Sequence, residues 1–287
     1  MADKSIIILG STGMLGSIAC KYFNKMSPEG WSVEGLNREH FDAAETWHVR
    51  RELCPYIRQG DVVINCVGVL KPDIEHKGRI NTININSVFP QIVADLCNEC
   101  GARFVHICSD CVFTGNAGGY TEADVCDADD LYARTKSLTP DGCSVIRTSF
   151  VGPSKQGKGL LEWVKSNNNQ SIEGYTNCIW NGMTCVTLCQ FIHKCINNNR
   201  WWNGVLHAYT HNSVSKFELC KLIARVYDMN VDVKPITATH ISGSRVNGVL
   251  DRRLASVHSA SIGHIQNISI EEQLISQRDF LNHTDGQ

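Results

Sequence analysis

The 287-residue sequence predicts an α/β fold, a Rossmann-type doubly wound parallel sheet with a smaller, interleaved α/β region. Two observations support this prediction. Short apolar runs at Ser5–Leu9, Asp61–Val69 and Arg103–Cys108 are typical of strands that are buried on both faces, as in parallel sheets. Helical patterns lie between these runs, and the first run leads directly into a glycine-rich turn.

Further elements continue this alternation along the chain. We expect a second strand at Trp31–Leu36 and a helix at Pro90–Cys100. In the second half, amphipathic patterns predict helices at Leu160–Asn167, Met183–Asn197 and Lys216–Tyr227. There are no repeats and no low-complexity linker, so any second domain should be interleaved with the end of the sheet.

Composition narrows the class of protein. Hydrophobic residues make up 43% and charged residues 20% of the chain, as in ordinary globular proteins. The formal net charge of −2 provides no basic field for nucleic acid. No apolar run reaches 18 residues and the N-terminus shows no signal pattern, so we expect a cytoplasmic protein without a membrane partner.

The 14 cysteines and 11 histidines show no convincing metal pattern. Cys97 and Cys100 are spaced as a Cys-x-x-Cys pair, and Cys108 and Cys111 repeat that spacing without a suitably placed histidine. A zinc site is the weaker interpretation, and reduced, mostly buried thiols are the expected state. We therefore predict no metal and no structural disulfide, and we interpret His207 and His211 as structural residues.

The glycine-rich turn predicts a dinucleotide site. Gly10, Gly13 and Gly16 are three residues apart between a buried strand and a helix, where backbone amides can approach a pyrophosphate. After the second strand, Asn37 and Arg38 stand where NAD-specific folds place an acid. A guanidinium suits a 2′-phosphate, so we expect NADPH, although Arg38 could instead point to solvent. The expected cofactor contacts are Gly10, Thr12, Gly13, Met14, Leu15, Gly16, Asn37, Arg38, Cys66, Val67, Gly68, Asn86, Tyr132 and Lys136.

Three polar residues predict proton-transfer chemistry on a carbonyl or alcohol. Tyr132 and Lys136 are four residues apart, so in a helix they share one face. The ammonium should lower the pKa of the phenol, which suits it to exchange a proton near neutral pH. Ser109 follows an apolar strand, at the edge of the sheet where ligands bind, and could hold the same substrate oxygen.

Seven short segments carry a family pattern: Cys108–Gly115, Tyr120–Glu122, Tyr132–Lys136, Arg147–Ser149, Gly204–His207, Ser215–Glu218 and Asn247–Asp251. With the glycine turn, they resemble the extended short-chain dehydrogenase/reductase superfamily and, within it, the dTDP-4-dehydrorhamnose reductase family. The resemblance implies NADPH-dependent reduction of a 4-keto-6-deoxy nucleotide sugar, with Ser109, Tyr132 and Lys136 as the catalytic triad. It implies an NADP-binding domain at residues 1–150 and a mainly substrate-binding region at residues 151–287. A homodimer is compatible with it.

Cys111 departs from the bacterial reductases, which usually have tyrosine at this position. GDP-fucose synthase and plant-type UDP-rhamnose epimerase/reductase have cysteine there, and both combine 3,5-epimerisation with 4-reduction. The C4 ketone acidifies the C3 and C5 hydrogens, and a thiol can move such protons near neutral pH. If the segment stays extended, Ser109 and Cys111 project to the same side. By resemblance, Lys165 is the expected partner of Cys111, with Lys158 as the alternative.

The expected reaction is conversion of UDP-4-keto-6-deoxyglucose to UDP-L-rhamnose, with dTDP- or GDP-linked sugars as alternative substrates. A simple 4-reductase without epimerase activity stays open, as does an NADP-binding regulatory subunit, because the family contains both. Substrate contacts are expected from Val112, Phe113, Arg245 and Arg252. The two arginines suit a diphosphate, although either could be a solvated surface charge.

Overall fold

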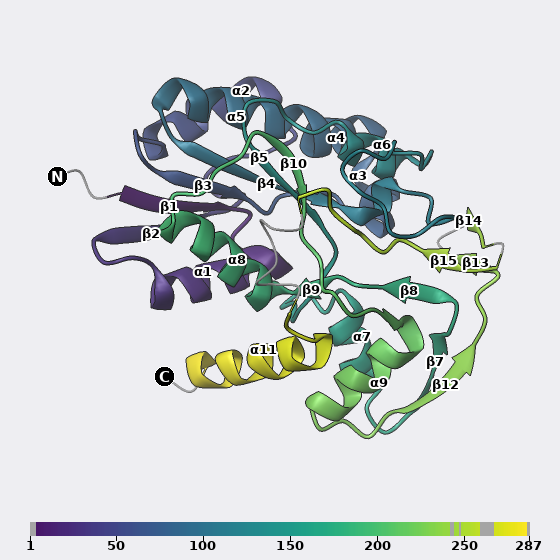
Figure 1. The fold of residues 1–287 in the computed structure, drawn as a ribbon. Coiled ribbons are helices and arrows are strands. Elements are labelled where there is room, and N and C mark those ends of the chain that lie inside the picture. The colour runs from purple at the N-terminus through teal and green to yellow at the C-terminus, as the bar shows by residue number, and fades with distance from the viewer. Residues whose placement is uncertain (1–3, 242–243, 247, 259–266, 286–287) are drawn as a thin grey trace. The chain divides into compact units, whose positions relative to one another are not determined.

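The computed structural model describes residues 4–241, 244–246, 248–258 and 267–285 (Figure 1). The chain divides into two compact units that alternate along the sequence. The first contains Met1–Val112, Cys126–Arg147 and Cys189–Leu206, and the second contains Phe113–Val125, Thr148–Leu188 and His207–Gln287. The domain boundary expected at residue 150 stays a prediction.

The first unit is built mainly from alternating strands and helices. Its elements are β1 (Lys4–Leu9), α1 (Met14–Met26), β2 (Trp31–Leu36), α2 (Thr46–Leu53), η1 (Cys54–Tyr56), β3 (Val62–Asn65), η2 (Lys71–Asp73), α3 (Ile74–Lys77), α4 (Arg79–Ile83), the π-helix η3 (Asn84–Val88), α5 (Phe89–Cys100), β4 (Arg103–Ser109), η4 (Asp110–Val112), α6 (Leu131–Ser137), β5 (Ser144–Thr148), α8 (Cys185–Asn197) and β10 (Gly204–His207), although β5, α8 and β10 each extend into the second unit.

A six-stranded sheet organises this unit, in the order β10-β5-β4-β3-β1-β2. The β1–β2, β1–β3 and β3–β4 pairs are parallel, which confirms the predicted α/β fold with a parallel central sheet. Residues Ile6–Leu9 of β1 and Val62–Asn65 of β3 are fully buried, as expected for strands covered on both faces. The chain leaves β1 toward β2 on one side and returns to β3 on the other, which makes a topological switch point between β1 and β3.

Helices lie on both faces of the sheet. Figure 1 shows α2 and α5 on one face and α1 with α8 on the other. The ring of Phe89, at the start of α5, stacks on that of Phe41, and Tyr22 of α1 contacts His193 of α8 at 3.2 Å. This arrangement is the doubly wound layering that the apolar strands require.

In its described residues, the second unit contains mostly short strands, with helices between them. Its elements are β6 (Phe150–Val151), α7 (Leu160–Ser166), β7 (Ser171–Tyr175), β8 (Cys178–Trp180), β9 (Met183–Thr184), β11 (Val214–Ser215), α9 (Lys216–Val226), β12 (Asp232–Ile236), β13 (His240–Ile241), β14 (Ser244–Arg245), β15 (Leu250–Asp251) and α11 (Ile270–Asp285). Buried residues from β6, α7, β7, β8, α9 and α11 form a core around Trp180, Leu219 and Leu274.

Several predicted elements differ from the structure at their ends. The strand expected at Asp61–Val69 ends at Asn65, because the Asn65 side chain accepts a hydrogen bond from the backbone of Val67 and the chain turns there. The helix expected from Met183 begins at Cys185, because Met183 and Thr184 pair with β6. Thr184 then accepts a hydrogen bond from the backbone of Thr187, as a helix cap does.

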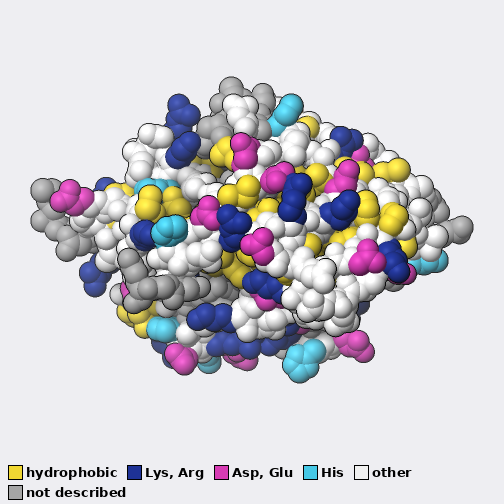
Figure 2. Space-filling view, turned by 90° about the horizontal axis from the view of Figure 1, so that it is seen from below, with side chains coloured by type: hydrophobic (Ala, Val, Ile, Leu, Met, Phe, Trp, Pro, Cys, Tyr) yellow, Lys and Arg dark blue, Asp and Glu magenta, His cyan; other side chains and the backbone are white. Residues whose placement is uncertain are grey.

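The exposed surface carries charges of both signs. Figure 2 shows Lys and Arg side chains interspersed with Asp and Glu on the face that it presents, with hydrophobic side chains between them. Among the described residues, no helix is both long enough and apolar enough to cross a membrane.

Gly16 provides a test of the packing between α1 and the glycine turn. A Cβ added at Gly16 would overlap the carbonyl oxygen of Gly10, so Gly16→Ala must displace the helix or the turn. Overpacking of this kind costs roughly 1–3 kcal/mol of unfolding free energy. Chemical denaturation should show that loss for Gly16→Ala. For Lys25→Ala, at an exposed position on the same helix, the change should stay within about 0.5 kcal/mol. Equal stability of the two variants would contradict the packing argument.

Candidate active site

The glycine turn lies at the switch point of the sheet. Gly10 has φ of +82° and donates its N–H to the carbonyl of Leu36 at 2.8 Å, which fixes the turn to the end of β2. An added Cβ at Gly10 would also lie 3.0 Å from the side chain of Val67. Gly13 is the N-cap of α1, and no side chain in the described chain caps that helix. The first amides of α1 are therefore suited to an anionic group.

The loop after β3 lies beside this turn. Cys66 donates its N–H to the carbonyl of Leu9 at 3.0 Å. The side chain of Asn86, which is 1% exposed, accepts from the N–H of Val69 at 2.8 Å and donates to its carbonyl at 3.1 Å. Gly68 is exposed, with no neighbouring atom closer than 3.5 Å to an added Cβ. The structure therefore brings Gly10, Cys66, Val67, Gly68 and Asn86 together in one unit.

Asn37 and Arg38 follow β2. The Asn37 side chain accepts from the N–H of Glu39 at 2.8 Å and lies 3.0 Å from Nδ1 of His40, so it stabilises the turn. Arg38 is exposed on this turn. Because its guanidinium is already exposed, Arg38 can bind an anionic ligand without first breaking buried contacts.

Ser109 ends β4, but the chain does not continue as a strand. Asp110–Val112 form a single 3-10 turn, and the N–H of Cys111 donates to Oγ of Ser109 at 3.1 Å. The expectation that Ser109 and Cys111 project to one side of an extended segment is therefore wrong, because this hydrogen bond curls the chain. Cys111 nevertheless remains a half-buried thiol near the phenol of Tyr132.

Tyr132 and Lys136 lie on α6 as the spacing predicts, and both are buried, with 9% and 6% exposure. The Tyr132 phenol is hydrogen-bonded to Ser109. Nζ of Lys136 donates to the carbonyl of Ile107 at 2.9 Å, and the thiol of Cys108 donates to the carbonyl of Lys136 at 3.1 Å. The predicted triad residues thus come together at the carboxyl end of β4.

The expected lowering of the phenol pKa by Lys136 does not occur in this structure. Burial raises the pKa of Tyr132 well above its ordinary value, nearby Cys111 raises it further, and the Ser109 hydrogen bond opposes these effects. Burial lowers the pKa of Lys136, while Cys108 raises it. Tyr132 is therefore a neutral phenol, which is the form that can donate a proton to a developing alkoxide.

The contacts that hold α6 in place were not predicted from the sequence. Asp130 is its N-cap and accepts from the N–H of Ala133 at 3.1 Å, and its other oxygen lies 3.0 Å from Nζ of Lys71. The hydroxyl of Thr135 accepts from Asn86 at 3.2 Å, and Ser87 donates to the carbonyl of Thr135 at 2.8 Å. An aspartate directly before a helix was a usable signal for the cap, whereas the Lys71 contact had no sequence signal.

A buried pair lies behind the site on β3 and β4. Nδ2 of Asn65 donates to Nδ1 of His106 at 3.0 Å, and both residues are fully buried. Burial, with a smaller effect of Lys136, lowers the pKa of His106 well below its ordinary value, so the imidazole is neutral. It adds no positive charge beside Lys136.

Lys165 belongs to the second unit, on α7. Its Nζ lies 3.2 Å from Oε1 of Glu162 and 5.5 Å from the centre of the Tyr227 ring. The same Glu162 oxygen accepts from the N–H of Ser154 at 3.1 Å. Lys158, the alternative, is exposed on the loop before α7. The pairing of either lysine with Cys111 stays a prediction.

The four predicted substrate contacts differ in what the structure describes. The side chains of Val112 and Phe113 are 0% exposed, so only their backbones could meet a ligand. Phe113 stacks on Tyr120, and its carbonyl accepts from Nε of Arg252 at 2.8 Å. The backbone of Arg245 ends β14, but its side chain lies outside the described part, as does the whole of Asn247.

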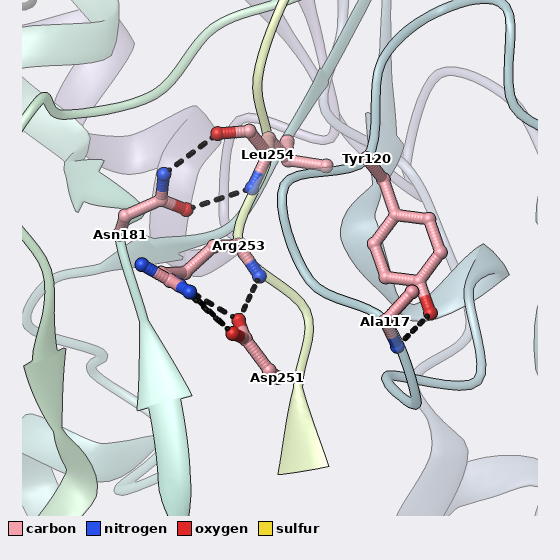
Figure 3. A network of polar contacts seen from close by, with 6 residues as sticks. All are labelled: Ala117, Tyr120, Asn181, Asp251, Arg253 and Leu254. Atoms are coloured by element: carbon pink, nitrogen blue, oxygen red, sulfur yellow. Dashed lines mark hydrogen bonds and ion pairs between the residues drawn. The ribbon is translucent and has the colours of Figure 1, made fainter. Parts of the chain in front are cut away.

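Polar contacts hold the loops of the second unit together (Figure 3). Asp251 accepts hydrogen bonds from Nε of Arg253 at 2.9 Å and from Nη2 at 2.6 Å, and Asn181 bonds the backbone of Leu254 through both amide atoms. The hydroxyl of Tyr120 accepts from the N–H groups of Gly115 and Ala117, each at 3.1 Å. Backbone hydrogen bonds join the two loops, because the N–H of Asp251 donates to the carbonyl of Gly115 at 2.7 Å and the N–H of Tyr120 donates to the carbonyl of Arg253 at 2.9 Å. Residues 115–120 and 251–254 therefore form one structure.

Glu122 joins this structure to the end of β10. Its carboxylate accepts from the N–H of His207 at 2.7 Å, the hydroxyl of Ser256 at 2.6 Å and the N–H of Val257 at 3.0 Å. His207 is fully buried, and its Nδ1 lies 2.9 Å from the carbonyl of Ala255, which gives it a structural role.

The fold and the site define a Rossmann-type α/β protein with a Ser-Tyr-Lys arrangement at the carboxyl edge of its parallel sheet. The model of the family described as RmlD substrate binding domain matches residues 4–245. The chain therefore belongs to this family.

Relatives agree with this assignment. A dTDP-4-dehydrorhamnose reductase of Mycobacterium tuberculosis is 30% identical over 176 residues, which cover 56% of this chain and 55% of that protein. Methionine adenosyltransferase 2 subunit beta of Rattus norvegicus is 26% identical over 144 residues, which cover 47% of this chain and 41% of that subunit. The chain thus spans about half the length of these curated relatives.

A solved structure covers nearly the whole chain. The dTDP-4-dehydrorhamnose reductase of Bacillus anthracis in complex with NADP has a TM-score of 0.82 and 22% identity, covering 98% of this chain and 99% of that chain. At this identity the likeness shows the shared fold.

Glu122 should make the stability of the protein depend on pH. Burial alone would raise its pKa, but the hydrogen bonds from Ser256 and His207 outweigh burial and lower it from the ordinary value of 4.5. The carboxylate therefore contributes stability above that ordinary value, and the contribution is lost as pH falls through the lowered folded pKa. Urea denaturation should show Glu122→Gln to be less stable than wild type at pH 7, with the difference shrinking in acid.

The matched control for this measurement is Glu173→Gln, the same substitution at an exposed position on β7 of the same unit. Its stability should stay close to that of wild type across the pH range, because surface substitutions of this kind have small effects. A loss of stability in Glu122→Gln that is independent of pH would contradict the role given to the charge.

Proposed function

We propose that the chain is an NADPH-dependent reductase of a nucleotide-linked 4-keto-6-deoxyhexose. The observation that carries this proposal is the hydrogen-bonded Ser109–Tyr132 pair, which lies at the carboxyl ends of the parallel strands, as the glycine turn does. Lys136 is buried one helical turn from Tyr132. The M. tuberculosis and B. anthracis reductases support the same substrate class.

The residues of the first unit fit a dinucleotide. The amides at the start of α1 would hold the pyrophosphate, Arg38 the 2′-phosphate, and the exposed backbone at Gly68 the middle of the cofactor. Lys136 would hold the nicotinamide ribose. NADPH, when bound, supplies the hydride for C4 of the sugar.

The protein's own groups then manage the proton. Ser109 would position the C4 oxygen through its hydroxyl, and Tyr132 would donate its phenolic proton to that oxygen as negative charge develops on it. The raised pKa of Tyr132 keeps this proton in place before the reaction. Each turnover leaves a phenolate that must regain a proton from solvent.

We further propose that Cys111 makes the enzyme a 3,5-epimerase as well, with UDP-4-keto-6-deoxyglucose as substrate and UDP-L-rhamnose as product. The half-buried thiol lies near Tyr132, which would bring it close to the carbons that flank the ketone. Inversion requires one group to remove a proton and another to return one on the opposite face. Lys165 is the proposed second group, with Lys158 as the alternative.

Two other functions have support from particular relatives. The two reductases favour a simple 4-reductase that acts on an already epimerised, dTDP-linked sugar, as their names indicate. The match to methionine adenosyltransferase 2 subunit beta, which is named as a subunit of another enzyme, keeps the alternative of an NADP-binding regulatory subunit open. Turnover and isotope incorporation distinguish these functions from the bifunctional one.

The decisive experiment is incubation with NADPH and UDP-4-keto-6-deoxyglucose in deuterated water, with the product analysed by NMR. The bifunctional proposal predicts an L-rhamnose product that carries deuterium at C3 and C5. Cys111→Ala should abolish incorporation, whereas Tyr132→Phe should abolish reduction and retain exchange into the unreduced sugar. Cys126→Ala, at another half-buried cysteine of the same unit, is the matched control and should behave as wild type.

Other outcomes identify the alternatives. A non-epimerised product without deuterium, or full incorporation by Cys111→Ala, would contradict epimerisation by Cys111. Reduction of pre-epimerised dTDP- or UDP-linked sugar alone would identify the simple reductase. NADPH binding without turnover of UDP-, dTDP- or GDP-linked sugars would favour the regulatory subunit.

Arg38 should determine the preference for NADPH. A charge-assisted hydrogen bond to phosphate is worth roughly 1.5–3 kcal/mol, so Arg38→Ala should weaken NADPH binding by about 10- to 100-fold. Binding of NADH should change little, because NADH has no 2′-phosphate. Fluorescence titration of both cofactors measures the two effects, and exposed Arg58→Ala is the control. An equal loss for both cofactors would contradict recognition of the 2′-phosphate.

A further inference from the structure

An ion pair connects the loop after β3 to the start of the helix that carries Tyr132. Nζ of Lys71 lies 3.0 Å from Oδ2 of Asp130, and the two side chains are 30% and 29% exposed. Both residues belong to the first unit. They are 59 positions apart in the sequence, so the pair fixes two distant segments to each other.

Asp130 uses its two oxygens for different purposes. Oδ1 accepts from the N–H of Ala133 and caps α6, while Oδ2 binds Lys71. The helix α6 has only seven residues, and a helix this short has little stability of its own. Its orientation must therefore come from contacts such as these.

Lys71 begins η2, directly after a loop that is itself anchored. Asn86 holds both backbone polar groups of Val69, two residues before Lys71, and donates to Thr135 of α6 as well. The loop therefore meets α6 at two points, through Asn86 near the middle of the helix and through Lys71 at its first turn. The Lys71 contact therefore adds a restraint on the first turn of α6 to those that Tyr132 and Lys136 receive from β4.

We propose that Lys71 is a positioning residue, which through Asp130 holds the first turn of α6, and hence Tyr132, in register with the loop Cys66–Leu70. The assignment of a catalytic role to Tyr132 rests on the function proposed above. The proposal that Lys71 restrains α6 is independent of that function, because it depends on the contacts alone.

Because the Lys71–Asp130 pair is partly exposed, its loss should affect turnover and global stability to different extents. Ion pairs at such positions contribute little to global stability, so the melting temperature should change by less than about 2 °C. A small displacement of a catalytic group, by contrast, can lower turnover strongly. Loss of Lys71 should therefore affect kcat more than stability.

The first measurement is hydrogen–deuterium exchange of the α6 peptide in the intact protein. Lys71→Met should speed exchange in residues 131–137 about threefold or more, because the first turn opens more often. Lys71→Arg keeps the charge and should restore protection. Asp130→Asn keeps a good N-cap but removes the charge, so it should resemble Lys71→Met. Arg225→Met breaks the Arg225–Glu271 pair of the second unit and should leave this peptide unchanged.

The second measurement is steady-state kinetics of the reductase reaction at low and high salt. Lys71→Met should lower kcat by about threefold to tenfold with a smaller change in KM. At about 1 M salt the ion pair of the wild type is screened. The differences between Lys71→Met and wild type in kcat and in the exchange rate of α6 should therefore both narrow. A residue that merely supports folding would not give a difference that salt removes.

The outcomes separate this inference from the proposed function. Unchanged exchange in Lys71→Met overturns the restraint, whatever the activity. Faster exchange with unchanged kcat overturns the role in positioning Tyr132. Faster exchange in a protein whose wild type reduces no sugar supports the restraint and counts against the proposed function alone.

Discussion

The side chain of Asn86 is the contact on which the arrangement of the first unit's site most depends. One buried amide satisfies both backbone groups of Val69 and donates to Thr135, so it joins the loop after β3 to α6. Asn86 lies in the π-helix Asn84–Val88, where each backbone hydrogen bond spans one residue more than in an α-helix and the side chains are rotated accordingly. If this amide were lost, both backbone groups of Val69 would lose the partner that it provides, and the Thr135 hydroxyl would keep only its bond to the carbonyl of Tyr132. Unsatisfied polar groups are costly inside a protein.

Most of the fold could be predicted from the sequence because its signals are local. Apolar runs predicted the strands, and the glycine spacing predicted the turn at Gly10–Gly16, since both depend on residues that are neighbours in the chain. The predicted ends of strands and helices were less accurate where a side chain accepts a hydrogen bond from a nearby backbone N–H, as Asn65 and Thr184 do. Such hydrogen bonds compete with the regular pattern and leave no periodic signal.

The sequence was enough to predict where Ser109, Tyr132 and Lys136 lie in the fold, but not the electrostatics around them. The spacing of Tyr132 and Lys136 correctly placed both on one short helix. The apolar run before Ser109 correctly placed that residue at the end of a strand. The direction of the Tyr132 pKa shift depends on burial and on Cys111, and neither is encoded by the four-residue spacing. The Lys71–Asp130 pair could not be predicted either, because its members are 59 positions apart in the sequence.

The origin of the strand β10 has a consequence for dissecting the protein. Gly204–His207 come from the second half of the chain, yet they form the edge of the six-stranded sheet next to β5. A fragment that stopped after β5 would expose the backbone of β5 as a new edge, and it would also lack α8 on one face of the sheet. Unpaired edges of this kind recruit other chains and lead to aggregation. Circular permutation, which keeps every segment, is therefore a better route than truncation to a rearranged form of this protein.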